Sequence, residues 1–364
     1  MTSADLATTS LETIRQQFAF ERQSAKARHR DIAEKLQISE GELIAAHAGV
    51  HEETALLHAT RLQADWAALL KALQPLGEVM ALTRNISCVH EKTGVYKNVS
   101  DAGHVGLVLG GEIDLRAFYS HWTHGFAVSE SVEKGVQRSL QFFDAGGTAI
   151  HKVFIKPQSD VEAYEAFVKH FADQNQTPSI TTTHAPPLPV DKPDSEIDVA
   201  GFHAAWRALQ DTHDFFGLLK QYGVSRLQSM RLAEKQYVQQ VNLESARQVL
   251  EAAANDGVAV MIFVANPGMV QIHSGMIKKV AVMGPWLNVL DPGFNLHLRE
   301  DHIASAWVVR KPTVDGLVTA LELFDAEGNV IAMFFGERKP GKPELTEWRA
   351  LVEALLKDHE LCLN

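Results

Sequence analysis

The chain has 364 residues, enough for two domains of ordinary size, and 46% of its residues are hydrophobic. Its formal net charge of −11 argues against a surface built to neutralise nucleic-acid phosphates, so any anion site has to be local. Cys88 and Cys362 are too few for a disulfide framework, and neither a signal peptide nor a membrane-length apolar run is visible. These features predict a cytoplasmic protein.

An internal repeat with a constant offset organises the chain. Asn85, Val89 and Gly94 recur as Asn266, Val270 and Gly275, and Phe143-Asp144-Ala145 recurs at the same offset as Phe324-Asp325-Ala326. The unbroken offset indicates one duplicated domain. An interface between two such copies is a natural place for a large apolar ligand.

The expected elements follow the same order in each copy. An N-terminal repeat, 1–175, has helical spacing over 10–73, short Val-, Ile- and Phe-rich strands over 79–155, and a closing helix at 160–174. Residues 176–200 are rich in proline and form a predicted linker. A C-terminal repeat, 201–364, has helices over 202–256, strands over 258–335 and a last helix near 344–356. The predicted class is α+β, a tandem structural duplication in which each half is a large antiparallel β-sheet with flanking α-helices.

A histidine stands in an aromatic segment of the second repeat. Trp206, Leu209, His213 and Phe216 follow the spacing of one stripe on a single helix. One interpretation is a core-edge histidine bonded to a backbone carbonyl. The other is an axial ligand to a haem iron, which a neutral imidazole among aromatic rings would suit.

Arg116 and Phe118 form the second candidate group. In an extended strand they share a face with Asp114, while Ile113, Leu115 and Ala117 share the other. The counterpart of Arg116 in the second repeat is His297. A change from Arg to His in apolar surroundings suggests specialisation, although Arg116 could also simply pair with Asp114.

Two basic pairs close apolar strands: Arg310-Lys311 and Arg338-Lys339. Taken singly, such pairs are often a solvated rim. In an acidic chain, basic groups beside an aromatic cleft are also what two ligand carboxylates would need. No Walker A loop, dinucleotide-binding glycine motif or nucleophile elbow is present in the sequence.

Six segments are specific enough to compare with known families: Thr83-Arg84-Asn85, Val89 to Tyr96, Ile113 to Arg116, Asp211 to Phe216, Met261 to Val264 and Arg310 to Thr313. With these segments, nearly the whole chain resembles the bacterial cytoplasmic haem-binding or hemin-degrading factors of the HemS/HmuS/ChuS/PhuS type.

The resemblance implies that haem b binds between the halves. It assigns His213 as the proximal iron ligand, Arg116 as the distal group and Phe118 as a lining residue. Arg226, Lys311 and Arg338 resemble the residues that hold the propionates. Some members carry tyrosine where this chain has Phe335, and others carry further histidines where it has Asp214 and Phe216.

The implied function is an intracellular haem-binding protein of haem uptake and iron acquisition. It would deliver haem to a partner, such as a haem oxygenase or the cytoplasmic side of an importer, or degrade it with an external reductant, in which case Arg116 would be catalytic. The sequence leaves carriage and degradation both open, and His297 remains an alternative ligand. A remote alternative is a DNA-binding regulator, suggested by the helical pattern at 36–46.

Overall fold

A computed structural model describes residues 10–50, 52, 54–101, 103–183, 190–338 and 341–363. The chain divides into two compact units. Unit 1 contains residues 1–83, 93–186 and 266–269, and unit 2 contains residues 84–92, 187–265 and 270–364. Each unit therefore holds a short segment of the other sequence repeat.

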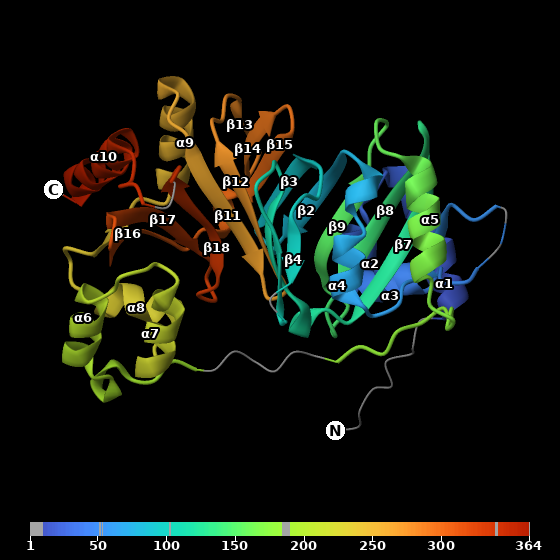
Figure 1. Ribbon diagram of the computed structural model, residues 1–364, viewed down its shortest axis with the longest axis horizontal. Helices are drawn as coiled ribbons and strands as arrows, with labels where there is room; N and C mark the ends of the chain where they lie inside the picture. Colours follow the sequence, from blue (N-terminus) through green and yellow to red (C-terminus); the bar gives the residue numbers. More distant parts are fainter. Residues whose placement is uncertain are drawn as a thin grey trace. The chain divides into compact units, whose positions relative to one another are not determined.

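Unit 1 combines helices with two groups of strands (Figure 1). Its helices are α1 (Leu11–Ala25), α2 (His29–Leu36), α3 (Glu40–Ala45), α4 (Trp66–Lys71) and α5 (Val161–Phe171), with short 3-10 turns η1 (Gln74–Leu76) and η2 (Tyr119–His121). Its strands are β1 (Leu57–Arg61), β2 (Val79–Arg84), β4 (Val99–Asp101), β5 (Val105–Val108), β6 (Asp114–Phe118), β7 (His124–Val132), β8 (Gly135–Phe143) and β9 (Ala149–Ile155).

Unit 2 repeats this plan. Its helices are α6 (Val199–Arg207), α7 (Asp214–Tyr222), α8 (Arg226–Leu232), α9 (Ser245–Asp256) and α10 (Thr346–Leu363), with η3 (Asp194–Glu196) and η4 (Glu300–His302). Its strands are β3 (Cys88–Gly94), β10 (Val238–Val241), β11 (Val260–Asn266), β12 (Met269–Gly275), β13 (Val280–Met283), β14 (Trp286–Asp291), β15 (Phe294–Arg299), β16 (Ser305–Thr313), β17 (Gly316–Phe324) and β18 (Val330–Gly336).

Nine strands make up each of two sheets. One strand order is β1-β7-β8-β9-β2-β3-β15-β14-β13, and the other is β10-β16-β17-β18-β11-β12-β6-β5-β4. Every strand pair whose register is described is antiparallel, as in Thr83 opposite His151 between β2 and β9. The predicted α+β class with two large antiparallel sheets is confirmed.

Two asparagines anchor the segments that the repeats exchange. In unit 2, Asn85 Nδ2 donates to the carbonyl oxygen of Ile331 at 2.8 Å. In unit 1, Asn266 Nδ2 donates to the carbonyl oxygen of Ile150, also at 2.8 Å. The two donors occupy equivalent positions of the repeat, and so do the two acceptors, so the exchange obeys the internal repeat.

Helix starts follow the local sequence. Ser39 accepts from the backbone N–H of Glu42, whose side chain in turn accepts from the backbone N–H of Ser39, which is a complete capping box for α3. Asp160 and Asp198 accept from the first turns of α5 and α6. Because these side chains satisfy N–H groups that would otherwise lack partners, they fix where the helices begin.

Turn glycines recur at the same place in both repeats. Gly147 has φ +77° and Gly328 has φ +84°, and each lies in the turn before the last strand of its repeat. Asp144 and Asp325 accept from nearby backbone N–H groups in these turns. A positive φ at low cost requires glycine, which explains why this Asp-x-x-Gly pattern was kept in both copies.

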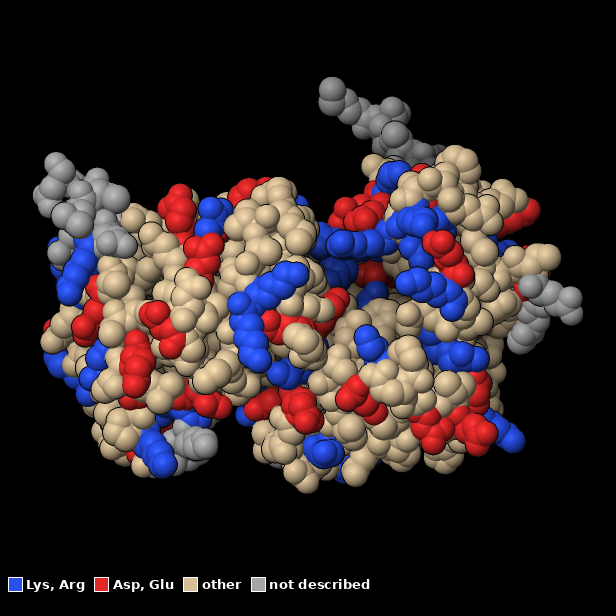
Figure 2. Space-filling view, turned by 90° about the horizontal axis from the view of Figure 1, so that it is seen from above, with Lys and Arg blue, Asp and Glu red and all other residues tan. Residues whose placement is uncertain are grey.

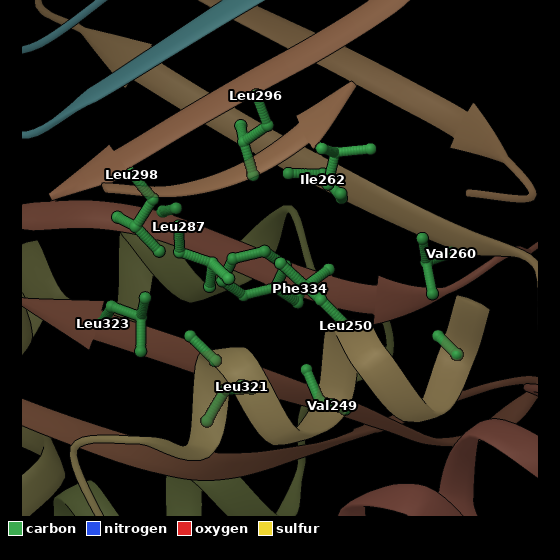
Figure 3. Packing of buried hydrophobic residues seen from close by; sticks show 14 of the residues in the cluster. Val249, Leu250, Val260, Ile262, Leu287, Leu296, Leu298, Leu321, Leu323 and Phe334 are labelled. Atoms are coloured by element: carbon green, nitrogen blue, oxygen red, sulfur yellow. The ribbon is translucent and has the colours of Figure 1, made fainter. Parts of the chain in front are cut away.

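Each unit has its own core. In unit 2, Val249 and Leu250 of α9 pack against sheet residues that include Ile262 and Phe334 (Figure 3). In unit 1, Tyr164 and Phe167 of α5 lie in the core over β7 and β8, where Tyr164 Oη donates to backbone carbonyls (Figure 1). Burial of these side chains supplies the main stabilisation, at about 1.5–3 kcal/mol for each large apolar group.

Two strands lie where helix was expected. β1 falls inside the predicted helical region 10–73, and β10 falls inside 202–256. Both are short edge strands, and each pairs with a long neighbouring strand, β7 or β16. The predictions were wrong there because pairing to a neighbouring strand outweighs local helical spacing.

Among the described residues, no helix is long and apolar enough to cross a membrane.

Several histidines are buried in the cores. His47, His90, His151 and His273 are each at most 4% exposed. Burial lowers the pKa of His47 to about 4, of His151 to about 3 and of His273 to about 3, and places the pKa of His90 well below its usual value. All four are therefore neutral in the folded protein near neutral pH.

Acidification is predicted to destabilise the fold before its carboxylates titrate. Below about pH 6.5 these histidines bind protons in the unfolded chain but stay neutral in the folded protein. The free energy of unfolding therefore falls by about 1.4 kcal/mol per pH unit per histidine. Denaturant unfolding between pH 7 and 5 measures this slope. His47→Gln should reduce the slope, whereas His104→Gln, at an exposed position, should not. An unchanged slope in His47→Gln would contradict the assignment.

Candidate functional site

His213 lies in the short connection between α6 and α7, where it is the N-cap residue of α7. Its side chain is 88% exposed. The prediction that Trp206, Leu209, His213 and Phe216 form a stripe on one helix is wrong, because α6 ends at Arg207. Trp206 and Leu209 are buried, whereas His213 and Phe216 face outward. The interpretation of His213 as a core-edge histidine is excluded as well.

Asp211 fixes the orientation of the His213 ring. Its Oδ1 atom accepts from the backbone N–H of His213 at 2.9 Å and lies 2.7 Å from His213 Nδ1. These bonds, the backbone one first, hold the pKa of Asp211 below its usual value, so Asp211 is a carboxylate. A carboxylate at Nδ1 requires the proton to be on that nitrogen. Nε2 is then the ring nitrogen left for a ligand, which is the arrangement of a metal-bound imidazole with its supporting carboxylate.

A buried ion group lies beneath α7. Arg226 donates to Glu322 through two nitrogens at 2.7 and 2.8 Å, and Lys311 Nζ lies 3.0 Å from Glu322 Oε1. The side chain of Glu322 is fully buried and that of Lys311 is 5% exposed. Lys311 Nζ also lies 4.1 Å from the ring centre of Phe215, two residues after His213. The group thus joins α8, β16 and β17 to the first turn of α7.

The charges in this group do not cancel. Burial acts to raise the pKa of Glu322, but Arg226 and Lys311 lower it to about 2. Burial lowers the pKa of Lys311 to about 8 against the attraction of Glu322. At neutral pH two cations face one carboxylate, so the group carries an excess positive charge. Nη1 of Arg226 makes no hydrogen bond to another described residue, which leaves it available to an added anion.

Arg338 pairs with a different carboxylate from the one that Arg226 and Lys311 share. It follows β18, its side chain is 22% exposed, and its Nη2 atom lies 3.9 Å from Asp315 Oδ2 in the β16–β17 turn. Its Nε atom is buried without a hydrogen-bond partner in the described part of the chain. Lys339 lies outside the described residues.

Arg116 and Phe118 lie on β6 in unit 1. The predicted alternation is confirmed, since Leu115 and Ala117 are buried while Arg116 and Phe118 are partly exposed. Arg116 Nη1 donates to Asp114 Oδ1 and, at 3.1 Å, to the carbonyl oxygen of Leu115. Pairing with Asp114, one of the two interpretations of Arg116, is therefore present in the structure.

His297 lies on β15 in unit 2, partly buried. Its Nδ1 atom lies 2.7 Å from the side-chain oxygen of Asn288 on β14. Unlike His213, it has a strand environment and a neutral partner. A hollow of about 290 Å³ lies instead beside α7, lined by residues of α6, α7 and their connection that include Ala205, Leu209, Asp214 and Leu218.

The first repeat lacks the equivalent ion group. Glu130 is the repeat counterpart of Lys311, and Gln141 is the repeat counterpart of Glu322. Glu130 is bonded to His29 at 2.9 Å and to Arg22 at 2.5 Å. The excess positive charge beneath a helix N-terminus therefore belongs to the second repeat.

Charge is mixed on one face of the molecule. On the face seen in Figure 2, basic side chains occur in groups among acidic ones and uncharged residues. This distribution fits an acidic chain in which anion binding depends on local groups rather than on net charge.

The sequence interpretation missed Asp211 and Glu322. Asp211 stands two residues before His213, the spacing at which an aspartate accepts from its own backbone in a turn. Glu322 is the single charged residue in the apolar strand β17, a position that requires a buried partner. Both signals were present in the sequence.

Removal of the carboxylate at the centre of the ion group is predicted to be strongly destabilising. Glu322→Gln would leave Arg226 and Lys311 buried without a counter-charge, which costs about 3–5 kcal/mol in unfolding free energy. Denaturant unfolding measures this loss of unfolding free energy. Glu300→Gln is the matched control, because Glu300 also forms a two-nitrogen bond with an arginine, Arg247, but in a more exposed place. That loss should stay below about 1 kcal/mol. Equal losses would contradict the role of Glu322.

Comparison with known proteins gives consistent matches over both repeats. The family model for the haemin-degrading HemS/ChuX domain matches residues 37–171 and again 223–355. The hemin transport protein HmuS of Yersinia pestis is 41% identical over 339 residues, which cover 91% of this chain and 95% of that protein.

Solved structures agree with the sequence matches. Holo-PhuS, a heme-binding protein from Pseudomonas aeruginosa, is 42% identical with a TM-score of 0.91, covering 95% of this chain and 99% of that one. The heme degrading enzyme ChuS of Escherichia coli O157:H7 is 35% identical with a TM-score of 0.86, at the same coverage.

Proposed function

The chain belongs to the HemS/ChuX haemin-degrading domain family, and from this premise we propose that it binds haem b in haem uptake and iron acquisition, with His213 as the axial iron ligand. The observation that carries the proposal is the pair of Asp211 and an 88% exposed His213, which presents one imidazole nitrogen to a ligand. One imidazole is sufficient because the porphyrin supplies four further nitrogens to the iron.

The residues around His213 fit the rest of haem. The exposed ring of Phe216 offers apolar contact to a flat macrocycle. Arg226 and Lys311, with their excess positive charge, would attract the two propionates, and Nη1 of Arg226 is free of hydrogen bonds to described residues. Lys311 is already held by Glu322, so its effect on a propionate would be through charge. Arg338 would supply a further cation.

We assign Arg116 and Phe118 to the opposite face of haem. The guanidinium of Arg116 would donate a hydrogen bond to a water or to oxygen near the iron, and Phe118 would line the pocket. Arg116 would have to exchange at least part of its bonding to Asp114 for this role. His297 serves as the alternative ligand against which His213 is tested.

Carriage of haem is the proposal that HmuS, a hemin transport protein, and PhuS, a heme-binding protein, support best. A receiving haem oxygenase or an importer would be the partner. Degradation is the second candidate, and the likeness to the heme degrading enzyme ChuS favours it. Haem would itself supply the oxygen chemistry, while an external reductant supplies electrons.

His213→Ala is predicted to weaken haem binding and to change the absorbance of the bound haem, since the iron loses its nitrogen ligand. Titration of the purified protein with haem, followed by absorbance, measures both effects. His297→Ala is the matched control and should leave the spectrum and the saturation point unchanged. Loss of the spectrum in His297→Ala and not in His213→Ala would transfer the ligand role to β15.

Degradation is tested with haem-loaded protein and ascorbate, in the presence and absence of catalase. If the protein opens the ring, product spectra should persist with catalase, and Arg116→Ala should alter turnover while haem stays bound. Complete suppression by catalase would show that free peroxide attacks the ring. Carriage would then be the function.

A further inference from the structure

Unit 1 contains a buried tyrosine bonded to a histidine. Tyr96 is 0% exposed and His151 is 1% exposed. The phenolic oxygen of Tyr96 lies 2.6 Å from His151 Nε2, and His151 Nδ1 lies 2.9 Å from Thr83 Oγ1. Thr83 and His151 are direct partners across β2 and β9, so the strand register sets the second contact.

These contacts define where the protons are. The phenolic proton has Nε2 of His151 as its acceptor. His151 Nδ1 must then carry the imidazole proton and donate it to Thr83 or to the adjacent backbone. Burial raises the pKa of Tyr96 and lowers that of His151, so in the resting state the phenol keeps its proton and the imidazole is neutral.

Two other buried phenolic oxygens in unit 1 lack such a base. Tyr164 Oη donates to backbone carbonyls at 3.3 and 3.4 Å, and a carbonyl cannot take up a proton. The hydroxyl of Tyr119 is buried without a hydrogen-bond partner among the described residues. Tyr96 is thus the one of these three tyrosines that can lose a proton inside the core.

Aromatic rings connect this pair to the strand that carries Phe118. Tyr119 follows Phe118, and its ring centre lies 6.0 Å from that of Trp122. Trp122 lies 4.7 Å from Phe142, and Phe142 is the direct strand partner of His151. The path from β6 to Tyr96 therefore runs through adjacent side chains of one core.

We propose that Tyr96 and His151 form a redox-active pair, in which a one-electron oxidant removes an electron from Tyr96 while its phenolic proton moves to His151 Nε2. The O–H bond breaks and an N–H bond forms, giving a neutral tyrosyl radical and an imidazolium. Return of one electron and the same proton restores the pair. The oxidant class is a strong one-electron acceptor, which haem treated with peroxide supplies, so this link rests on the proposed function.

By giving up an electron, the pair would reduce haem that peroxide has oxidised and so protect the haem from damage. A phenol cannot be oxidised readily in an apolar core unless its proton has an acceptor, because loss of an electron makes the phenol a far stronger acid than imidazolium, even with the lowered pKa of His151. His151 removes that obstacle without exchange of protons with solvent. Low exposure also protects the radical from reaction with solutes.

The first experiment uses the full chain without haem, so it is independent of haem binding. A photogenerated ruthenium(III) polypyridyl complex oxidises the protein, and electron paramagnetic resonance detects the tyrosyl radical. Tyr96→Phe should abolish the buried radical signal and Tyr164→Phe, the matched control, should retain it. His151→Gln keeps Tyr96 but removes the base, and should also lose the signal. The yield in the native sequence should not depend on buffer pH near neutrality.

A buried radical signal that persists in Tyr96→Phe would overturn the proposal. So would an unchanged radical signal in His151→Gln, provided that this variant unfolds at the same denaturant concentration as the native sequence. The second arm adds peroxide to haem-loaded protein. A radical that disappears in Tyr96→Phe supports the link to haem, and a radical seen only in the photochemical arm overturns that link. Failure of haem to bind would appear in the titration and leave the first arm intact.

Discussion

A single buried carboxylate organises the surroundings of His213, the proposed iron ligand. Glu322 is fully buried on β17 and bonds both Arg226 on α8 and Lys311 on β16, while Lys311 and Arg226 both lie against Phe215 in the first turn of α7. Breaking such a group is far more costly than its net contribution to stability suggests, because each member would be left as a buried unpaired charge. The ion group therefore fixes the position of α7 and of His213 at its N-terminus.

The two repeats show how a duplicated fold can acquire different chemistry. The turn asparagines, the turn glycines and the strand order were kept in both copies, since they form the backbone of each sheet. The position of Lys311 is Glu130 in the first copy, where it bonds a histidine and an arginine. The first copy has the buried Tyr96–His151 pair in its core. These charged positions diverged while the turn residues did not.

Much of the fold was accessible from sequence because the repeat and the turn signals are local. The closing helix at 160–174 is α5, and the predicted strand regions hold all the strands of the described residues except β1 and β10. β1 and β10 were missed because pairing with β7 and β16 is not local. His213 was singled out for the wrong reason: an aromatic stripe was inferred, whereas the ring is exposed and held by Asp211. Hydrophobic periodicity continued across the break between α6 and α7, so it could not reveal a loop.

The most direct test is a crystal structure of the chain with haem bound. We expect iron bonded to Nε2 of His213, with Nδ1 still hydrogen-bonded to Asp211 and the propionates near Arg226. Iron bonded to His297, or His213 turned so that Asp211 is released, would contradict it.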